Sequence, residues 1–275
     1  EGRPYILKAL DLAREHRLEQ ITYILNRLCF LSIRSGTLDQ AIHYARESLL
    51  TAETWGDTRA VARGYTMLAR THWQLGDIDS AAFYVNEAAI RYDRIGSMRG
   101  LAEVWNTRGE LARTRGDLEA AELAYLEANA HYESCGSSDA IFCKLNLGST
   151  YVNGKKFTKA RTILDTIEND LTGSGHVSVI MVTQLVRVNC FIHDQDWERV
   201  EEDLDRLAPK LEEVGLFDTD IASAARLAGL ACEEQGRLDL AHKAWKIVHS
   251  QMTALGRTEE AAEAAAKLAG SDDAV

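Results

Sequence analysis

The chain has 275 residues, 46% of them hydrophobic and 27% charged, and a net charge of −11. This acidic balance argues against nucleic acid as a partner, because non-specific binding depends on Lys and Arg side chains that neutralise phosphates. No apolar run reaches the roughly 18 residues of a membrane-spanning helix, so we expect no membrane contact either. Only two prolines occur, which favours long helices, since proline breaks a helix from within.

The cysteines predict free thiols rather than disulfides or a metal site. Their number is odd, no two form a Cys-x-x-Cys pair, and four lie in helical patterns. Buried free thiols are typical of a reducing compartment, so we expect a cytoplasmic protein with no cofactor and no metal. The five residues are Cys29, Cys135, Cys143, Cys190 and Cys232.

The first expected element is a helix over residues 4–16, and two glycine series follow it. Each series has a period of about 40 residues, and the two alternate about 20 residues apart. A glycine after an apolar-periodic segment is typical of a helix C-terminus, which often needs a left-handed residue. We therefore predict repeats of helix A, glycine turn, helix B and glycine turn. The first series is Gly36, Gly76, Gly116, Gly154 and Gly236, and the second is Gly56, Gly96, Gly136, Gly175, Gly215 and Gly256.

Two places in each repeat hold a small side chain, which predicts close contact between helices A and B. Counting starts where we expect helix A to begin, near Thr22, Ala62, Ala102, Ile141, Met181 and Ala222. The eighth place is then Cys29, Ala69, Gly109, Gly148, Val188 or Gly229, and the twentieth is Ala41, Ala81, Ala121, Ala160, Val200 or Ala241. Large side chains such as Tyr125, Leu164 and Trp245 stand at the twenty-fourth place.

This pattern resembles the tetratricopeptide repeat, W-x-x-L-G-x-x-Y followed by A, F and A. The third repeat supplies Trp105, Gly109, Ala121, Tyr125 and Ala128, and the fourth supplies Leu147, Gly148, Tyr151, Phe157 and Ala160. The resemblance implies an all-α fold, a right-handed α-solenoid of antiparallel helix pairs. We expect one domain over residues 1–275, with repeats at 18–57, 58–97, 98–136, 137–175, 176–216 and 217–256, and a capping helix at 258–270.

The C-terminal half is similar to the repeat tails of large bacterial serine/threonine kinase–ATPase signalling proteins. The similarity lies in "DWERVEEDLDRL" and in "GLFDTDIASAARLAGLACEEQGRLDLAHKAW". The chain itself contains no kinase motif, neither a G-x-G-x-x-G before a strand nor an H-R-D. We therefore expect the chain to be a piece of a longer bacterial protein.

In the tetratricopeptide family, helix A lines a concave surface that binds partners through five of its places. Carried over, these places give three zones. The first repeat contributes Tyr23, Asn26, Phe30, Ile33 and Arg34. The next two form a mixed-charge stripe of Arg63, Thr66, Arg70, Trp73, Glu103, Asn106, Glu110 and Arg113. The fourth and fifth form a mostly apolar zone that includes Phe142, Leu145, Val152, Val182, Leu185 and Ile192.

This comparison predicts a partner-binding groove that joins an apolar anchor site to arginines. Its residues are Phe142, Leu145, Val152, Val182, Leu185, Ile192, Arg63, Arg70, Trp73, Asn106 and Arg113. The alternative is that neighbouring helices cover the apolar zone, which would make it part of the core.

Three further features allow more than one interpretation. "HDQD" (residues 193–196) replaces a glycine turn, so its polar residues either substitute for glycine or hold a divalent cation. Arg108 and Arg187 stand at the seventh place, which normally packs between helices, so each guanidinium must find a carboxylate or reach solvent. Pro209 should kink the helix that contains it.

No catalytic motif occurs, so we expect a non-enzymatic chain. "GSTYVNGKK" (residues 148–156) fails as a phosphate loop, because the glycine spacing is wrong and a lysine stands where Ser or Thr is needed. The first hypothesis is a protein–protein interaction scaffold or regulatory segment of a bacterial signalling protein. The alternative is a peptide or small-molecule sensor whose solenoid curvature changes on binding. The partner would be a protein or peptide, either separate or another domain of the parent chain.

Overall fold

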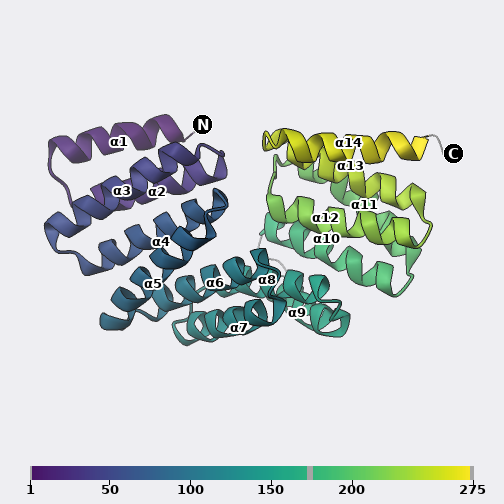
Figure 1. Cartoon of the computed structure of the whole chain (residues 1–275), viewed down its shortest axis with the longest axis horizontal. Helices are drawn as coiled ribbons and strands as arrows, with labels where there is room; N and C mark the ends of the chain where they lie inside the picture. The colour runs from purple at the N-terminus through teal and green to yellow at the C-terminus, as the bar shows by residue number, and fades with distance from the viewer. Residues whose placement is uncertain (1, 172–175, 273–275) are drawn as a thin grey trace. The chain divides into compact units, whose positions relative to one another are not determined.

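The computed structural model describes residues 2–171 and 176–272, and in these ranges all the regular structure is α-helical (Figure 1). In the described ranges, six helix pairs follow the first helix and precede the last. The helices are α1 (Arg3–Glu15), α2 (Ile21–Arg34), α3 (Leu38–Trp55), α4 (Thr58–Gln74), α5 (Ile78–Arg94), α6 (Met98–Thr114), α7 (Leu118–Ser134), α8 (Ala140–Asn153), α9 (Phe157–Leu171), α10 (Val177–His193), α11 (Trp197–Glu213), α12 (Thr219–Glu234), α13 (Leu238–Ala254) and α14 (Thr258–Asp272).

The chain divides into two compact halves, residues 1–143 and 144–275, and the point of division in the sequence lies in α8. In the N-terminal half, helix A of each repeat packs against its own helix B, and α4 contacts both α2 and α6. In the C-terminal half, α10 packs against α9, α11 and α12, and α13 packs against α12 and α14. Both halves therefore repeat one arrangement, in which paired helices are antiparallel and the A helices of consecutive repeats are neighbours.

Several of the turns between helices share one construction. One left-handed residue ends the first helix, and the next residue caps the following helix; at Gly76 φ is +79°, and Asp77 Oδ1 then accepts a hydrogen bond of 3.1 Å from the backbone N–H of Ser80. Such caps satisfy backbone donors that a helix start leaves unpaired. Caps at Asp57, Ser97 and Asp218 also explain why α4, α6 and α12 begin three or four residues earlier than we expected.

The predicted left-handed glycines are confirmed at nine positions and wrong at one. Gly154 lies in the turn after α8, but the left-handed residue there is Lys155, with φ +55°. The glycine stands one residue too early in "NGKKF", because α8 extends through Asn153 before the chain turns. Gly175 lies outside the described residues. The confirmed positions are Gly36, Gly56, Gly76, Gly96, Gly116, Gly136, Gly215, Gly236 and Gly256.

The "HDQD" turn confirms that polar residues substitute for glycine. Gln195 takes the left-handed position with φ +57°, and Asp196 caps α11. His193 stacks on the ring of Phe157 at 4.2 Å, and Asp194 forms an ion pair with Arg161. Each residue of this turn therefore has a structural role.

Pro209 does not end its helix. α11 is continuous from Trp197 to Glu213, so it extends on both sides of the proline.

The two small places confirm the predicted contact between helices A and B. All six residues at the twentieth place are at most 2% exposed, and the eighth-place residues are buried as well. A Cβ atom added to Gly109 would lie 2.5 Å from Cε1 of Tyr125, and one added to Gly229 would lie 3.0 Å from the ring of Trp245. The glycines are thus required by the large side chain at the twenty-fourth place of the same repeat.

We predict that Gly109→Ala lowers the free energy of unfolding by about 1–3 kcal/mol, because the added methyl group overlaps the ring of Tyr125. The second repeat pairs Ala69 with Val85 at these places. Combining Gly109→Ala with Tyr125→Val should therefore cost less than the sum of the single changes, by about 1 kcal/mol in a double-mutant cycle. Chemical denaturation measures all three variants, and strictly additive effects would contradict the contact.

We also predict that Gln195→Gly raises the free energy of unfolding by up to about 1 kcal/mol. A left-handed backbone is strained for a residue with a side chain and relaxed for glycine. The matched control is Gln195→Ala, which keeps the strain and should bring no gain. Equal effects of the two substitutions would show that the backbone conformation does not limit stability at this turn.

Candidate functional site

The A helices of the N-terminal half, α2, α4 and α6, lie side by side and form what we call the helix-A face. Five of the predicted groove residues belong to it. Arg63 is exposed, and the other four are partly buried. Trp73 Nε1 donates a hydrogen bond of 2.8 Å to Thr114 Oγ1, and Asn106 Nδ2 donates one of 2.9 Å to Glu110 Oε1. The five residues are Arg63, Arg70 and Trp73 of α4, and Asn106 and Arg113 of α6.

Glu103 of α6 lies at the electrostatic centre of this face. Burial raises the pKa of its carboxyl group, and the positive charges of Arg63, Arg70 and Arg99 reduce that shift without cancelling it. Arg99 is shared: its Nε lies 3.9 Å from Glu103 Oε1, and its Nη2 lies 2.7 Å from Asp139 Oδ2. Sequence reasoning missed Arg99 because α6 begins at Met98, ahead of the first place that we counted.

Arg63 and Arg70 form no ion pair and no hydrogen bond with any described residue. Arg70 instead lies over the ring of Phe30 in α2, with its guanidinium carbon 5.9 Å from the ring centre. Arg63 precedes Arg70 by seven residues, so both lie on one side of α4. The helix-A face therefore carries two guanidinium groups whose donors are available to a ligand.

Asn26 adds a buried polar group to the same face. The residue is only 7% exposed, and its Oδ1 accepts no hydrogen bond from the described part of the chain. Asn26 precedes Phe30 by one helical turn, which places it beside the ring that Arg70 covers. A buried polar atom without a partner costs about 1–3 kcal/mol, so a water molecule or a ligand group is expected at this amide.

The prediction of an open apolar zone is wrong for half of its residues. Leu185, Ile192 and Val152 are 0%, 4% and 6% exposed and belong to the core of the C-terminal half. α10 approaches α12 closely enough for Asn189 Nδ2 to donate a hydrogen bond of 3.1 Å to the carbonyl of Ala224, which explains the cover over α10. Leu145 and Val182 are partly buried.

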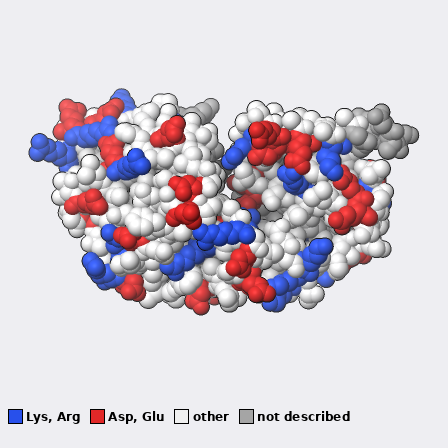
Figure 2. Space-filling view, viewed as in Figure 1, with Lys and Arg blue, Asp and Glu red and all other residues white. Residues whose placement is uncertain are grey.

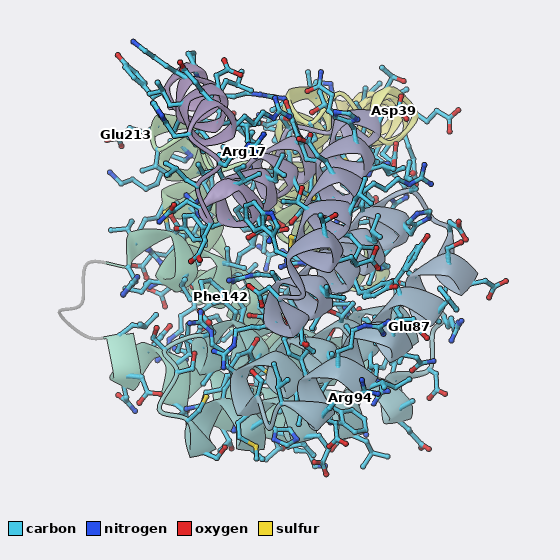
Figure 3. All side chains as sticks on the ribbon, turned by 90° about the vertical axis from the view of Figure 1, so that its left-hand side faces the viewer. Arg17, Asp39, Glu87, Arg94, Phe142 and Glu213 are labelled. Atoms are coloured by element: carbon cyan, nitrogen blue, oxygen red, sulfur yellow. The ribbon has the colours of Figure 1, made fainter. Side chains whose placement is uncertain are left out.

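Phe142, which is labelled in Figure 3, keeps an open side chain and is 54% exposed. It belongs to the N-terminal half. The side chain of Arg34 lies outside the described residues.

The two arginines at the seventh place have different partners for their partly buried guanidinium groups. Arg187 of α10 donates to Glu168 Oε2 at 2.6 Å and to Asp165 Oδ1 at 2.8 Å, as expected for a charge between helices. Arg108 of α6 forms no ion pair with a carboxylate of the described ranges. Its Nη2 donates to Asn86 Oδ1 at 3.0 Å, and its guanidinium carbon lies 4.6 Å from the ring centre of Trp105.

Four of the five cysteines are buried and unsuited to nucleophilic chemistry, whereas Cys135 is exposed. Burial raises the pKa of Cys29, Cys190 and Cys232 to about 11 and that of Cys143 to about 12, so these thiols stay protonated. Among the described residues, no group of three or more His, Cys, Asp and Glu side chains is arranged to hold a metal ion. None of the helices in the described ranges is long and apolar enough to cross a membrane.

Comparison with known proteins confirms the repeat. Residues 62–89, which include most of α4 and the first part of α5, match the family model described as tetratricopeptide repeat. No curated protein matches the sequence. The expected tetratricopeptide-repeat identity is therefore confirmed, and solved structures show the same fold along nearly the whole chain.

Three of these structures indicate the range of proteins with this fold. A Rap protein complexed with competence and sporulation factor is 14% identical, with a TM-score of 0.65; the alignment covers 99% of this chain and 71% of that one. A signal transduction ATPase with numerous domains and a tetratricopeptide repeat sensor, from Pyrococcus horikoshii, is 13% identical, with a TM-score of 0.66 and 92% and 42% of the chains covered. NprR in complex with its cognate peptide NprX is 14% identical, with a TM-score of 0.57 and 94% and 79% covered.

We predict that Glu103→Gln raises the melting temperature at pH 7.5. The folded chain holds the Glu103 proton more tightly than the unfolded chain, so the stability from this group is present below the unfolded pKa and is lost as the pH rises through the folded pKa. The gain should shrink towards pH 4, where wild-type Glu103 is protonated too. Thermal melts across this range test the effect, with exposed Glu127→Gln as the control. A loss of stability at pH 7.5 would show that the arginines outweigh burial.

Proposed function

We propose that this chain is a non-enzymatic recognition module of a bacterial signalling protein, and that its helix-A face binds an acidic protein or peptide segment. The observation that carries the proposal is the pair of unpaired arginines, Arg63 and Arg70, beside the buried amide of Asn26. A chain with a net charge of −11 has many carboxylates with which to neutralise arginines. On the face seen in Figure 2, positive and negative side chains are indeed interspersed.

The chemistry of the face fits a peptide better than a small anion alone. The guanidinium groups can each accept a carboxylate, the ring of Phe30 can contact an apolar side chain, and the amide of Asn26 can hydrogen-bond a peptide group. Glu103 lies among the arginines and repels further negative charge, so it limits which acidic segments fit. Complementary charge of this kind mainly sets association rate and specificity.

The comparisons support a protein or peptide partner. The structure of NprR contains its cognate peptide, and the Pyrococcus protein carries its tetratricopeptide repeats as a sensor. Because this chain spans 42% of the latter, we infer that it is one segment of a larger signalling protein, in which the partner is either a separate chain or another domain. Fold alone does not decide catalysis, so the non-enzymatic assignment rests on the site chemistry.

The second candidate is a peptide sensor whose helix packing changes when the ligand binds. The NprR–peptide complex favours this alternative. The two candidates differ in whether binding shifts the chain between conformations. Small-angle X-ray scattering with and without bound peptide separates them, because only the sensor changes its radius of gyration.

We predict that Arg63→Glu combined with Arg70→Glu weakens peptide binding at least tenfold. The probes are peptides selected from a displayed random library on the wild-type chain, with affinities measured by titration calorimetry. They should be rich in Asp and Glu, and their affinity should fall as salt increases, because exposed charges are screened. The control is Arg46→Glu, which reverses an exposed arginine on α3.

Two outcomes would contradict this function. One is that the selected peptides carry no excess of acidic residues. The other is that the double variant, with an unchanged melting temperature, binds them as tightly as the wild-type chain does.

A further inference from the structure

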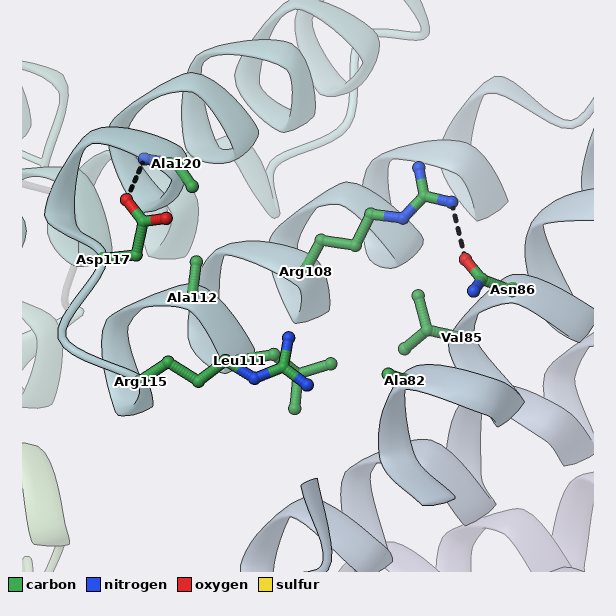
Figure 4. Close-up of a pocket in the computed structure, with 9 residues that line it drawn as sticks. All are labelled: Ala82, Val85, Asn86, Arg108, Leu111, Ala112, Arg115, Asp117 and Ala120. Carbon is green, nitrogen blue, oxygen red and sulfur yellow. Dashed lines mark hydrogen bonds between the residues drawn. The ribbon is translucent and has the colours of Figure 1, made fainter. Parts of the chain in front are cut away.

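A second cationic site lies outside the helix-A face, in a hollow of about 230 Å³ lined by α5, α6 and α7 (Figure 4). Three alanines make the room: Ala82 of α5, Ala112 of α6 and Ala120 of α7. Val85 and Leu111 form an apolar floor; both are nearly fully buried, at 2% and 4% exposed. The polar side chains that line this space are those of Asn86, Arg108, Arg115 and Asp117.

Arg108 is the central polar residue of this hollow, which we call the Arg108 hollow. Figure 4 shows its side chain reaching towards Asn86, which is the sole hydrogen-bond partner among the residues that the structure describes. A guanidinium carries five N–H donors, so most of them remain unused. Burial lowers the pKa of Arg108, which indicates that its charge is poorly compensated.

Arg187 gives an internal comparison, because it occupies the same place two repeats later. There, two carboxylates from α9 neutralise the buried guanidinium. Among the described residues, no carboxylate forms an ion pair with Arg108, although Asp117 lines the same hollow. Arg115 adds a second positive charge to the hollow, and its own ion pair is weak: the partner, Asp79, is fully exposed and 3.7 Å away. Asp117 is the one carboxylate among the residues that line the hollow, and its Oδ1 accepts a hydrogen bond of 3.0 Å from the backbone N–H of Ala120, so two guanidinium groups share this space with a single carboxylate.

Exposed apolar side chains of α5 and α7 form what we call the apolar rim of the hollow. Phe83 directly follows Ala82 on α5 and is 58% exposed, and Leu123 lies one turn after Ala120 on α7 and is 66% exposed. Ile90 continues the stripe on α5, two turns after Phe83, and is 53% exposed. A free small anion would leave this apolar rim uncovered, whereas a polypeptide segment would cover it.

We propose that the Arg108 hollow and its apolar rim form a second docking surface, which receives an Asp or Glu side chain carried between apolar residues of a partner protein. The carboxylate would complete the coordination of Arg108 as Glu168 and Asp165 complete that of Arg187. The apolar residues on either side would cover Phe83 and Leu123. This surface is built from α5–α7 side chains that the helix-A site does not use, so neither proposal depends on the other.

The test uses the full chain carrying Arg63→Glu and Arg70→Glu, so that the helix-A face cannot account for binding. A displayed random peptide library is selected on this chain, and the affinities of enriched peptides are measured by fluorescence anisotropy. We expect peptides with an acidic residue between apolar residues. Arg108→Gln should weaken their binding at least tenfold, and replacing the acidic residue of the peptide by its amide should do the same.

A second variant distinguishes a loss of binding from a loss of folding. Ala120→Leu fills the hollow and keeps both arginines, and it should also weaken binding at least tenfold with an unchanged melting temperature. The matched control is Arg94→Gln, which removes an exposed arginine from the last turn of α5 (Figure 3) and should have no effect.

The proposal is overturned if no peptide is enriched, or if enriched peptides bind the Arg108→Gln chain as tightly. It is also overturned if free glutarate binds at Arg108 as tightly as the peptides do, since the site would then belong to a small anion.

Discussion

Helix A can approach helix B only where neither helix presents a large side chain at the point of contact. The alanines at the twentieth place and the glycines at Gly109, Gly148 and Gly229 provide this space in every repeat that carries them. The rings of Tyr125 and Trp245 then pack on the bare backbone of the facing helix. Because the same contact recurs within each half of the chain, consecutive A helices of that half become neighbours. The helix-A face and the Arg108 hollow both depend on that regularity.

The arginines of this protein differ in the partners that their guanidinium groups contact. Arg187 is neutralised by two carboxylates and serves packing. Among the described residues, Arg108 contacts an amide and an aromatic ring, while Arg63 and Arg70 form no ion pair and interact only at longer range with the charge of Glu103. In an acidic protein, a cation left uncompensated is a specific feature, because any nearby Asp or Glu would satisfy it. In the proposed function, these are the positions at which a ligand would supply a carboxylate.

The turns show how packing overrides local preference. Lys155 and Gln195 adopt a left-handed backbone that glycine would take more easily, since the helices on either side fix where the chain must reverse. The same reasoning explains the correction to the apolar zone. Leu185 and Val152 fit the groove places of the family, but the close packing of long neighbouring helices encloses them. The sequence alone does not show whether a neighbouring helix covers an apolar residue on a helix surface.

The sequence by itself determined the helix pairs, the period, the small contact places and most of the turn glycines. These features follow from local rules: glycine takes a left-handed turn cheaply, and a helix face repeats every three to four residues. It also placed Arg63, Arg70 and Asn106 on one face. The tertiary structure alone decided that Leu185 is buried, that Asn26 Oδ1 lacks a partner in the described chain, and that Arg99 reaches Asp139. It also decided that Arg108 faces a hollow while Arg187 faces two acids. Burial and charge pairing arise between residues about 20 to 40 positions apart, and no local pattern records which of them finally meet.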